Sequence, residues 1–177
     1  MVARSEIEHR RVVLIGMMGA GKTTIGRLLA ARLHWRFWDN DEALEAATGE
    51  TAYEVQHQRS QAALHETEDR LLGEALRTTE PTVFAAAASV VLHPGVLRGV
   101  VTVWLRVSTD REARNIEHSG QHHRPLPAAP AAALERLSAE RLAMYERAAD
   151  ITIDVADDPD TTCDLLLQAL RGVTQSA

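Results

Sequence analysis

Short runs of apolar residues alternate with amphipathic stretches along most of the chain. Residues 12–15 are Val-Val-Leu-Ile, a β-branched run that predicts a strand buried on both faces. Residues 24–33 follow with apolar side chains at the spacing of one helix face, which predicts a helix. The same reasoning predicts further strands at 35–38, within 82–91, at 100–107 and at 151–155.

Capping residues and helix breakers predict the remaining helices. Thr51-x-x-Glu54 matches a capping box, and Gly49 and Pro159 mark the end of one helix and the start of another. The predicted helices cover 42–48, a short stretch after 51, 60–77, about 110–118, 131–149 and a final segment to about 170. This alternation predicts an α/β fold, with a central parallel five-stranded sheet and helices on both faces, in a single domain over residues 1–177.

Bulk composition narrows the class of protein. The chain has 177 residues, 45% hydrophobic and 25% charged, which is ordinary for a globular domain with its own core. Its net charge of −6 argues against a general nucleic-acid surface. One cysteine, Cys163, permits no internal disulfide and no cysteine-built metal site. The N-terminus is polar, and no apolar run approaches the ~20 residues that span a membrane, so we expect a cytoplasmic protein.

The strongest functional signal lies between the first predicted strand and the first predicted helix. Residues 16–23 fit G-x-x-x-x-G-K-[ST], the phosphate-binding P-loop, in the strand–loop–helix context that this motif requires. Lys22 is the only lysine among the 19 lysine and arginine residues, so a compact ammonium stands where β/γ-phosphates would bind. The predicted nucleotide-binding residues of this segment are Gly16, Met18, Gly19, Ala20, Gly21, Lys22, Thr23 and Thr24.

Two carboxylates, Asp39 and Asp41, follow the second predicted strand. Ligands bind at the carboxyl edge of a parallel sheet, and alternate residues of an extended segment point opposite ways. One of these aspartates would therefore face Mg²⁺ together with Thr23, while the other would face a substrate hydroxyl. The simpler alternative is that both aspartates only cap a helix that begins at Glu42.

A loop and a helix supply two candidate arginines. The segment of about 116–130 has the length of an active-site lid, and its Arg124 would stabilise charge on a transferring phosphoryl group. Arg141 and Tyr145 lie four residues apart on one predicted helix face, where Arg141 would bind a substrate carboxylate. The alternatives are a solvated loop arginine and a surface arginine on the helix.

Together these motifs resemble the shikimate kinase family, small P-loop kinases of aromatic amino-acid biosynthesis. The resemblance covers Val12 to about Leu170 and includes the P-loop, Asp39-x-Asp41, Glu68, Pro94-Gly95, Arg124-Pro125-Leu126 and Arg141-x-x-x-Tyr145. It implies ATP and Mg²⁺ as cofactors, with Asp39 helping to hold the metal and Asp41 acting as the base on the acceptor hydroxyl. It also implies catalytic roles for Lys22 and Arg124 at the phosphates, and a carboxylate contact for Arg141.

The chain departs from the family pattern on the acceptor side. Leu64-His65 replaces a Phe-Arg pair whose arginine grips the shikimate carboxylate, and Ala87-Ala88-Ser89 replaces three glycines. The added side chains would narrow the pocket, and a positive φ would be costly for alanine. Losing one of two charge-assisted contacts would weaken binding by ~30- to several-thousand-fold. The substrate-binding candidates at these positions are His65, Ala87 and Ala88.

Two functions of different classes stay open. The first is ATP-dependent phosphoryl transfer to a hydroxyl of a small molecule, either shikimate or a related hydroxylated acid. The second is a non-catalytic ATP-binding or regulatory protein that has lost its acceptor site. A nucleoside monophosphate kinase or a GTPase is less well supported, because no guanine-specific motif is evident. We expect a monomer that binds a small-molecule substrate, with no nucleic-acid or membrane partner.

Overall fold

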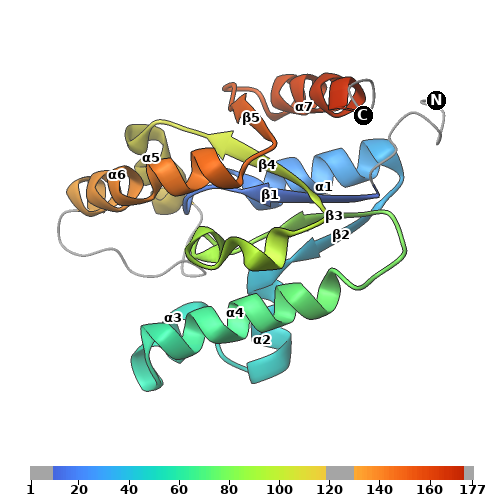
Figure 1. The fold of residues 1–177 in the computed structure, drawn as a ribbon. Coiled ribbons are helices and arrows are strands. Elements are labelled where there is room, and N and C mark those ends of the chain that lie inside the picture. The colour runs from blue at the N-terminus through green and yellow to red at the C-terminus, as the bar shows by residue number, and fades with distance from the viewer. Residues whose placement is uncertain (1–9, 119–129, 174–177) are drawn as a thin grey trace.

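The computed structural model describes residues 10–118 and 130–173, whose arrangement is shown in Figure 1. Five strands form one sheet in the order β2-β3-β1-β4-β5, and every neighbouring pair is parallel. The strands are β1 (Arg11–Ile15), β2 (Arg36–Asp39), β3 (Thr82–Ala85), β4 (Val101–Arg106) and β5 (Ile151–Asp154). The predicted five-stranded parallel sheet is therefore confirmed.

Helices cover both faces of this sheet, as predicted. Those described are α1 (Lys22–Leu33), α2 (Asn40–Thr48), α3 (Ala52–Gln58), α4 (Gln61–Ala75), α5 (Thr109–His118), α6 (Pro130–Ala148) and α7 (Pro159–Val173), with the 3₁₀ turns η1 (Val90–Leu92) and η2 (Pro94–Leu97). In Figure 1, α1 and α7 lie above the sheet, and α4 lies below it with α2 and α3.

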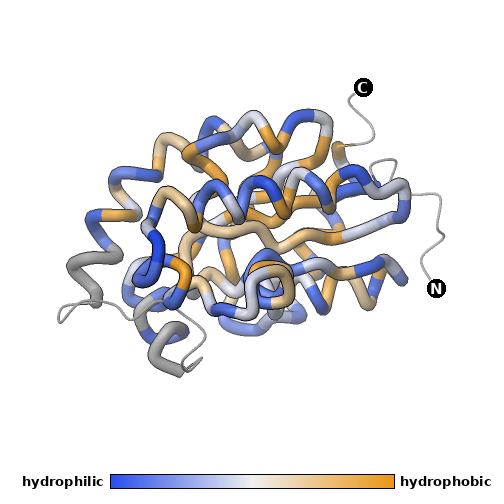
Figure 2. The backbone as a smooth tube through the Cα atoms, turned by 90° about the horizontal axis from the view of Figure 1, so that it is seen from below, coloured by the Kyte–Doolittle hydropathy of each residue, from blue (hydrophilic) through white to orange (hydrophobic). Residues whose placement is uncertain are grey.

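The core has two layers because successive residues of a strand point to opposite faces of the sheet. In β1, Val12 and Leu14 pack into the layer between the sheet and helices α1 and α7. Val13 and Ile15 pack into the layer on the opposite face, between the sheet and helices α4 and α6. All four side chains are fully buried. Figure 2 shows the apolar positions gathered along the strands and on the inner sides of the helices.

The strand predicted within 82–91 occupies only the first part of that apolar run. The apolar run at 82–91 contains β3, but the strand ends at Ala85 and the chain continues as a loop into η1. Buried positions after the strand account for the rest of the apolar run. Ala86, Val90 and Val91 are each at most 3% exposed but do not extend the sheet. A short apolar run does not by itself distinguish a strand from a buried turn.

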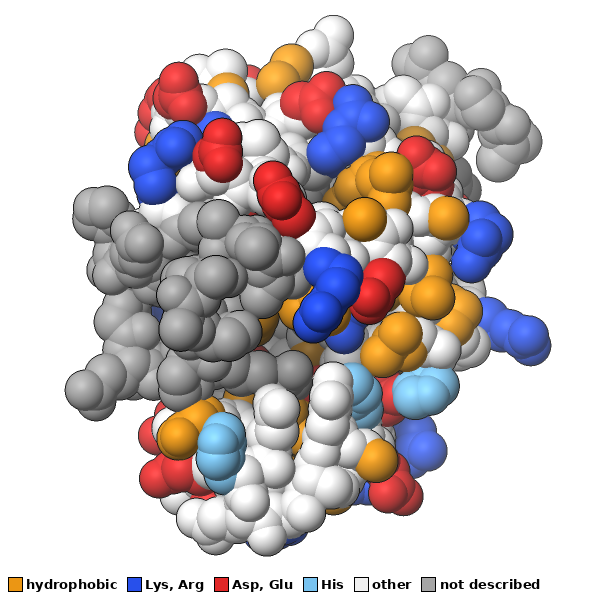
Figure 3. Space-filling view, turned by 90° about the vertical axis from the view of Figure 1, so that its left-hand side faces the viewer, with side chains coloured by type: hydrophobic (Ala, Val, Ile, Leu, Met, Phe, Trp, Pro, Cys, Tyr) orange, Lys and Arg blue, Asp and Glu red, His pale blue; other side chains and the backbone are white. Residues whose placement is uncertain are grey.

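All five strands deliver their carboxyl ends to the same edge of the sheet, which is where ligands bind in open α/β folds. Figure 3 faces this edge, and acidic and basic side chains are interspersed over the surface it shows. Across the described segments, no helix combines the length and the apolar character needed to cross a membrane.

Candidate active site

A cavity of about 860 Å³ opens at the carboxyl edge of the sheet. Its walls come from the loop after β1 with the first turn of α1, from α2, the start of α3 and α4, from the loop after β3, from α5 and α6, and from the loop after β5. The predicted site residues that line it are Met18, Gly19, Ala20, Gly21, Lys22, Thr23, Thr24, Asp39, Asp41, Ala87, Ala88 and Arg141. Segments far apart in the sequence therefore meet in one pocket.

The P-loop has the backbone geometry that its glycines permit. Gly21 adopts a left-handed conformation with φ 87° as the residue that precedes α1. Gly16 does not line the cavity, but a Cβ built on it would lie 2.8 Å from the carbonyl oxygen of Leu105, so this glycine lets the loop lie against β4. The N-terminus of α1 meets the cavity here, an arrangement that favours the binding of anions.

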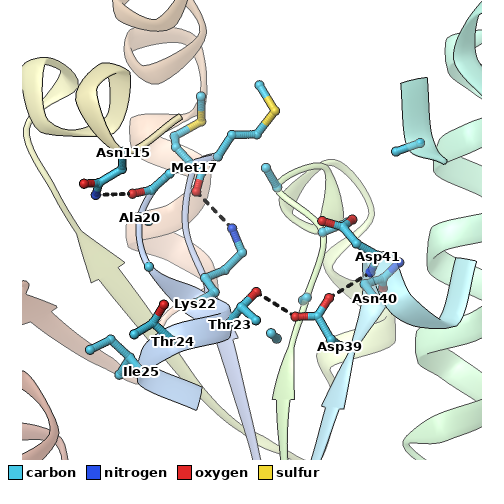
Figure 4. A pocket seen from close by; sticks show the side chains of 18 of the residues that line it. Met17, Ala20, Lys22, Thr23, Thr24, Ile25, Asp39, Asn40, Asp41 and Asn115 are labelled. Carbon is cyan, nitrogen blue, oxygen red and sulfur yellow. Dashed lines mark hydrogen bonds between the residues drawn. The ribbon is translucent and has the colours of Figure 1, made fainter. Parts of the chain in front are cut away.

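Lys22 lies at the centre of this loop. Its Nζ donates hydrogen bonds to the carbonyl oxygen of Gly16 at 2.8 Å and to that of Met17 at 2.9 Å, the second of which is drawn in Figure 4. Burial lowers the pKa of Lys22, whereas the nearby carboxylates of Asp41 and Asp39 raise it. These two carboxylates therefore favour the ammonium form that phosphate binding requires.

Thr23 and Asp39 form the candidate metal site. The Thr23 hydroxyl donates a hydrogen bond of 2.7 Å to Oδ2 of Asp39, which is buried at the last position of β2 (Figure 4). A hydroxyl and a carboxylate beside a phosphate-binding loop are the hard oxygen ligands that Mg²⁺ uses together with water and substrate phosphates. The two residues therefore fit the predicted ion.

Asp39 and Asp41 lie on either side of a strand–helix junction and do not alternate along one extended segment. Helix α2 begins at Asn40, two residues before the predicted start at Glu42, so the expectation of an extended segment here is wrong. Asp39 caps this helix by accepting the backbone N–H of Asp41 at 2.9 Å. The capping alternative thus holds for Asp39, in addition to its contact with Thr23. Asp41 lies in the first helical turn and lines the cavity.

The loop after β3 is held by two side chains of α6. Arg141 Nη1 at 3.0 Å and the Tyr145 hydroxyl at 2.8 Å both donate to the carbonyl oxygen of Ala88. Burial raises the pKa of Tyr145, so its hydroxyl stays a donor. Neither Ala87 nor Ala88 has a positive φ, since His34 is the only such non-glycine residue in the described ranges. The loop therefore accommodates alanine without left-handed strain.

Helix α4 contributes different residues to the cavity from those predicted. Gln61 and Glu68 line the cavity, and the buried Glu68 accepts a hydrogen bond of 2.5 Å from the Ser89 hydroxyl. His65 is buried on the same helix at 8% exposure but is not among the lining residues. The structure therefore does not bring His65 to the predicted substrate site.

The predicted lid is described only at its two ends. Helix α5 ends at His118 and α6 begins at Pro130. Arg124 falls between them, outside the described residues, so its position in the site stays a prediction.

Sequence reasoning missed the wall at the other end of the cavity. Arg111 donates to the carbonyl oxygens of Val155 at 2.7 Å and Ala156 at 2.6 Å, joining α5 to the loop after β5. Asn115, one helical turn after Arg111, donates to the carbonyl oxygen of Gly19 at 2.8 Å. Arg111 and Asn115 both line the cavity. The available signal was the loop's place after the last predicted strand, at the same edge as the other site segments.

Glu112 is a buried carboxyl group beside the P-loop that sequence reasoning also missed. It is 2% exposed on α5, and its Oε2 has no hydrogen-bond partner among the described residues. Burial raises the pKa of Glu112 to about 7, while the Lys22 charge and a hydrogen bond with Ser138 act in the opposite direction. Its charge therefore changes near neutral pH.

Comparisons with known proteins agree with this geometry. A family sequence model described as Shikimate kinase matches residues 18–171. The shikimate kinase of Nitrobacter winogradskyi is 36% identical over 154 residues, which cover 85% of this chain and 71% of that protein. The shikimate kinase of Synechococcus elongatus is 31% identical over 170 residues, covering 93% and 88%. A solved structure of Acinetobacter baumannii shikimate kinase in complex with shikimate shares the fold, with a TM-score of 0.86 at 24% identity and 97% coverage of both chains.

Proposed function

The chain belongs to the shikimate kinase family of P-loop small-molecule kinases, and we propose that it transfers the γ-phosphoryl group of ATP to a hydroxyl of shikimate or of a related hydroxylated acid. The observation that carries this proposal is the hydrogen-bonded pair of Thr23 and Asp39, with Lys22 and Asp41 on the walls of the same cavity. One pocket then combines a phosphate-binding loop, ligands for a metal ion and a carboxylate for the acceptor hydroxyl.

In the donor half, the P-loop amides and the N-terminus of α1 would hold the β- and γ-phosphates. Lys22 would leave the carbonyl oxygens of Gly16 and Met17 and bind the phosphates, because an ammonium gains more from an anion than from a carbonyl dipole. Thr23 and Asp39 would hold Mg²⁺, which neutralises phosphate charge when bound.

In the acceptor half, Asp41 would orient the acceptor hydroxyl and take its proton. Arg141 uses one guanidinium N–H for Ala88, and its remaining donors would bind the acceptor carboxylate. Arg124 would stabilise charge on the transferring phosphoryl group from the lid. In these roles Asp41 would carry out the acid–base chemistry at the acceptor hydroxyl, and Arg124 would stabilise the charge of the transferring phosphoryl group.

The acceptor wall supports an acid whose carboxylate meets one arginine and not two. Along α4 the described lining residues are the neutral Gln61 and the acidic Glu68, while Ala87 and Ala88 add methyl groups to the opposite loop. This composition is compatible with weaker binding of shikimate, or with another hydroxylated acid of similar size. The non-catalytic alternative rests on the same substitutions and differs from the kinase in having no turnover.

A coupled assay of ADP release with Mg-ATP, with and without shikimate, tests the proposal. Wild-type turnover that depends on shikimate, disappears in Lys22→Ala and falls at least ~100-fold in Asp41→Asn would support it. Mg-ATP binding without turnover on shikimate or a panel of hydroxylated acids would support the non-catalytic alternative. Full activity of Asp41→Asn would remove the assigned role of this carboxylate.

Other expectations from the sequence stay predictions. They are the single domain over residues 1–177, the monomeric state, the cytoplasmic location and the lack of a nucleic-acid partner. The molar mass in solution measured by light scattering tests the monomer directly.

A further inference from the structure

Asn40 places a buried, unsatisfied amide in the wall of the cavity. The residue is 2% exposed, and neither its Oδ1 nor its Nδ2 has a hydrogen-bond partner among the described residues. It nevertheless contributes to the cavity wall. A buried amide without a partner destabilises a protein, and in native structures such groups are uncommon enough to require an explanation.

The position of Asn40 assigns it to the acceptor half of the site. It is the first residue of α2 and lies between the two aspartates in the sequence. In Figure 4 the Asp39 carboxylate reaches toward Thr23, while Asn40 lies with Asp41 on the α2 side of that pair. Helix α2 also packs against α4, the helix that carries Gln61 to the cavity.

We infer that Asn40 is a positioning residue whose amide binds a second hydroxyl of the acceptor, next to the hydroxyl that faces Asp41. This inference rests on the proposed function. A side-chain amide both donates and accepts hydrogen bonds, as a hydroxyl does, whereas a carboxylate only accepts them. The acceptor class that fits is therefore an acid with two neighbouring hydroxyls. Because the amide is shielded from solvent in the free protein, this binding requires the first turn of α2 to shift when the acceptor enters.

The proposed role gives Asn40 different energetic effects in the free protein and in the complex with the acceptor. In the free protein the unsatisfied amide lowers stability, and in the complex it contributes to acceptor affinity. A purely structural asparagine would instead stabilise the free protein and have no separate effect on the acceptor. The two roles therefore predict opposite signs for the effect of one substitution on the melting temperature.

The experiment compares wild type with Asn40→Leu, which removes the amide and keeps the same branched arrangement of side-chain heavy atoms, and with Asn40→Ser, which replaces the amide with a single hydroxyl. The matched control is Gln56→Leu, because Gln56 on α3 also buries an amide oxygen without a partner in the described segments but does not line the cavity. We expect Asn40→Leu to raise the Tm of the ligand-free protein by ~2–8 °C. We expect its Kd and KM for shikimate to rise ~5- to 100-fold, with KM for Mg-ATP within ~2-fold of wild type.

The controls make each outcome decisive. Asn40→Ser should have an intermediate KM for shikimate, and Gln56→Leu should raise Tm and leave every KM unchanged. A lower Tm for Asn40→Leu, an unchanged affinity for shikimate, or an effect confined to Mg-ATP would overturn the inference while the proposed function stands. Shikimate binding without wild-type turnover, yet weakened by Asn40→Leu, would support the inference and reject the proposed reaction. If the wild type binds neither shikimate nor any acid of the hydroxylated-acid panel, both the inference and the proposed function are overturned.

Discussion

Thr23 and Asp39 are joined by a hydrogen bond of 2.7 Å although they lie 16 positions apart in the sequence. Thr23 belongs to the first turn of α1 and Asp39 is the last residue of β2, so the bond links the phosphate-binding loop to the neighbouring site segment. A metal ion bound here would take lone pairs from both oxygens, and the hydroxyl proton would turn away from the carboxylate. Metal binding would therefore replace this hydrogen bond.

Asp39→Asn should separate the metal role of this residue from its capping role. Asparagine retains an oxygen that can accept the Asp41 N–H, so the free energy of unfolding should change by less than ~1 kcal/mol. The lost negative charge should raise the Mg²⁺ concentration for half-maximal activity ~10- to 100-fold. A Mg²⁺ titration at fixed ATP measures this, with Glu66→Gln, an exposed carboxylate of α4, as the control. An unchanged Mg²⁺ requirement would reject Asp39 as a metal ligand.

The first strand, the P-loop and the first helix were predictable because local rules determine them. A buried strand, a glycine loop and an amphipathic helix follow one another within residues 11–33, and each has its own sequence pattern. The parallel sheet followed from the alternation of strands and helices. Asp39 was placed correctly at the carboxyl edge for the same reason, since it ends a strand.

The acceptor wall was less predictable because it depends on packing between distant segments. Gln61 and His65 lie one helical turn apart on α4, and only the docking of that helix decides which of them lines the cavity. Similarly, the contact of Arg111 with Val155 joins residues 44 positions apart. The end of the strand within 82–91 was not predictable, because the apolar residues of the loop after β3 satisfy burial and not strand pairing.

Tyr145→Phe should loosen the acceptor wall without removing its arginine contact. The variant deletes one of two donors to Ala88 and leaves the 3.0 Å bond from Arg141. We expect the free energy of unfolding to fall by ~0.5–1.5 kcal/mol and KM for the acceptor to rise a few-fold. Steady-state kinetics and urea unfolding measure the two effects. Tyr53→Phe is the matched control, because Tyr53 lies on α3 outside the cavity, and an equal KM change there would refute a specific role for Tyr145.

Glu112 should make stability fall as pH rises toward neutrality. Its pKa is about 7 in the folded protein against an ordinary value near 4.5, so between these pH values the folded state binds a proton that the unfolded state has lost. Stability is then fully present below pH 4.5 and decreases by roughly 3 kcal/mol as the pH passes 7. Glu112→Gln removes this titration, so its stability relative to wild type should increase over the same range. Urea unfolding from pH 5 to 8 tests this, with Glu146→Gln on the exposed side of α6 as the control. If the free energy of unfolding depends on pH in the same way for Glu112→Gln and wild type, the assignment is contradicted.

Gly16→Ala should damage the P-loop through the backbone that supports it. An added Cβ would lie 2.8 Å from the carbonyl oxygen of Leu105, and the φ of 151° is unusual for a residue with a side chain. Neither β1 nor β4 can move away easily, because they are paired neighbours in the buried sheet. We therefore expect a loss of ~1–3 kcal/mol in stability together with weaker Mg-ATP binding. Gly95→Ala is the matched control, since its added Cβ meets nothing within 4 Å and should leave both properties near wild type. If instead Gly16→Ala binds Mg-ATP as wild type does, the loop does not depend on its contact with β4.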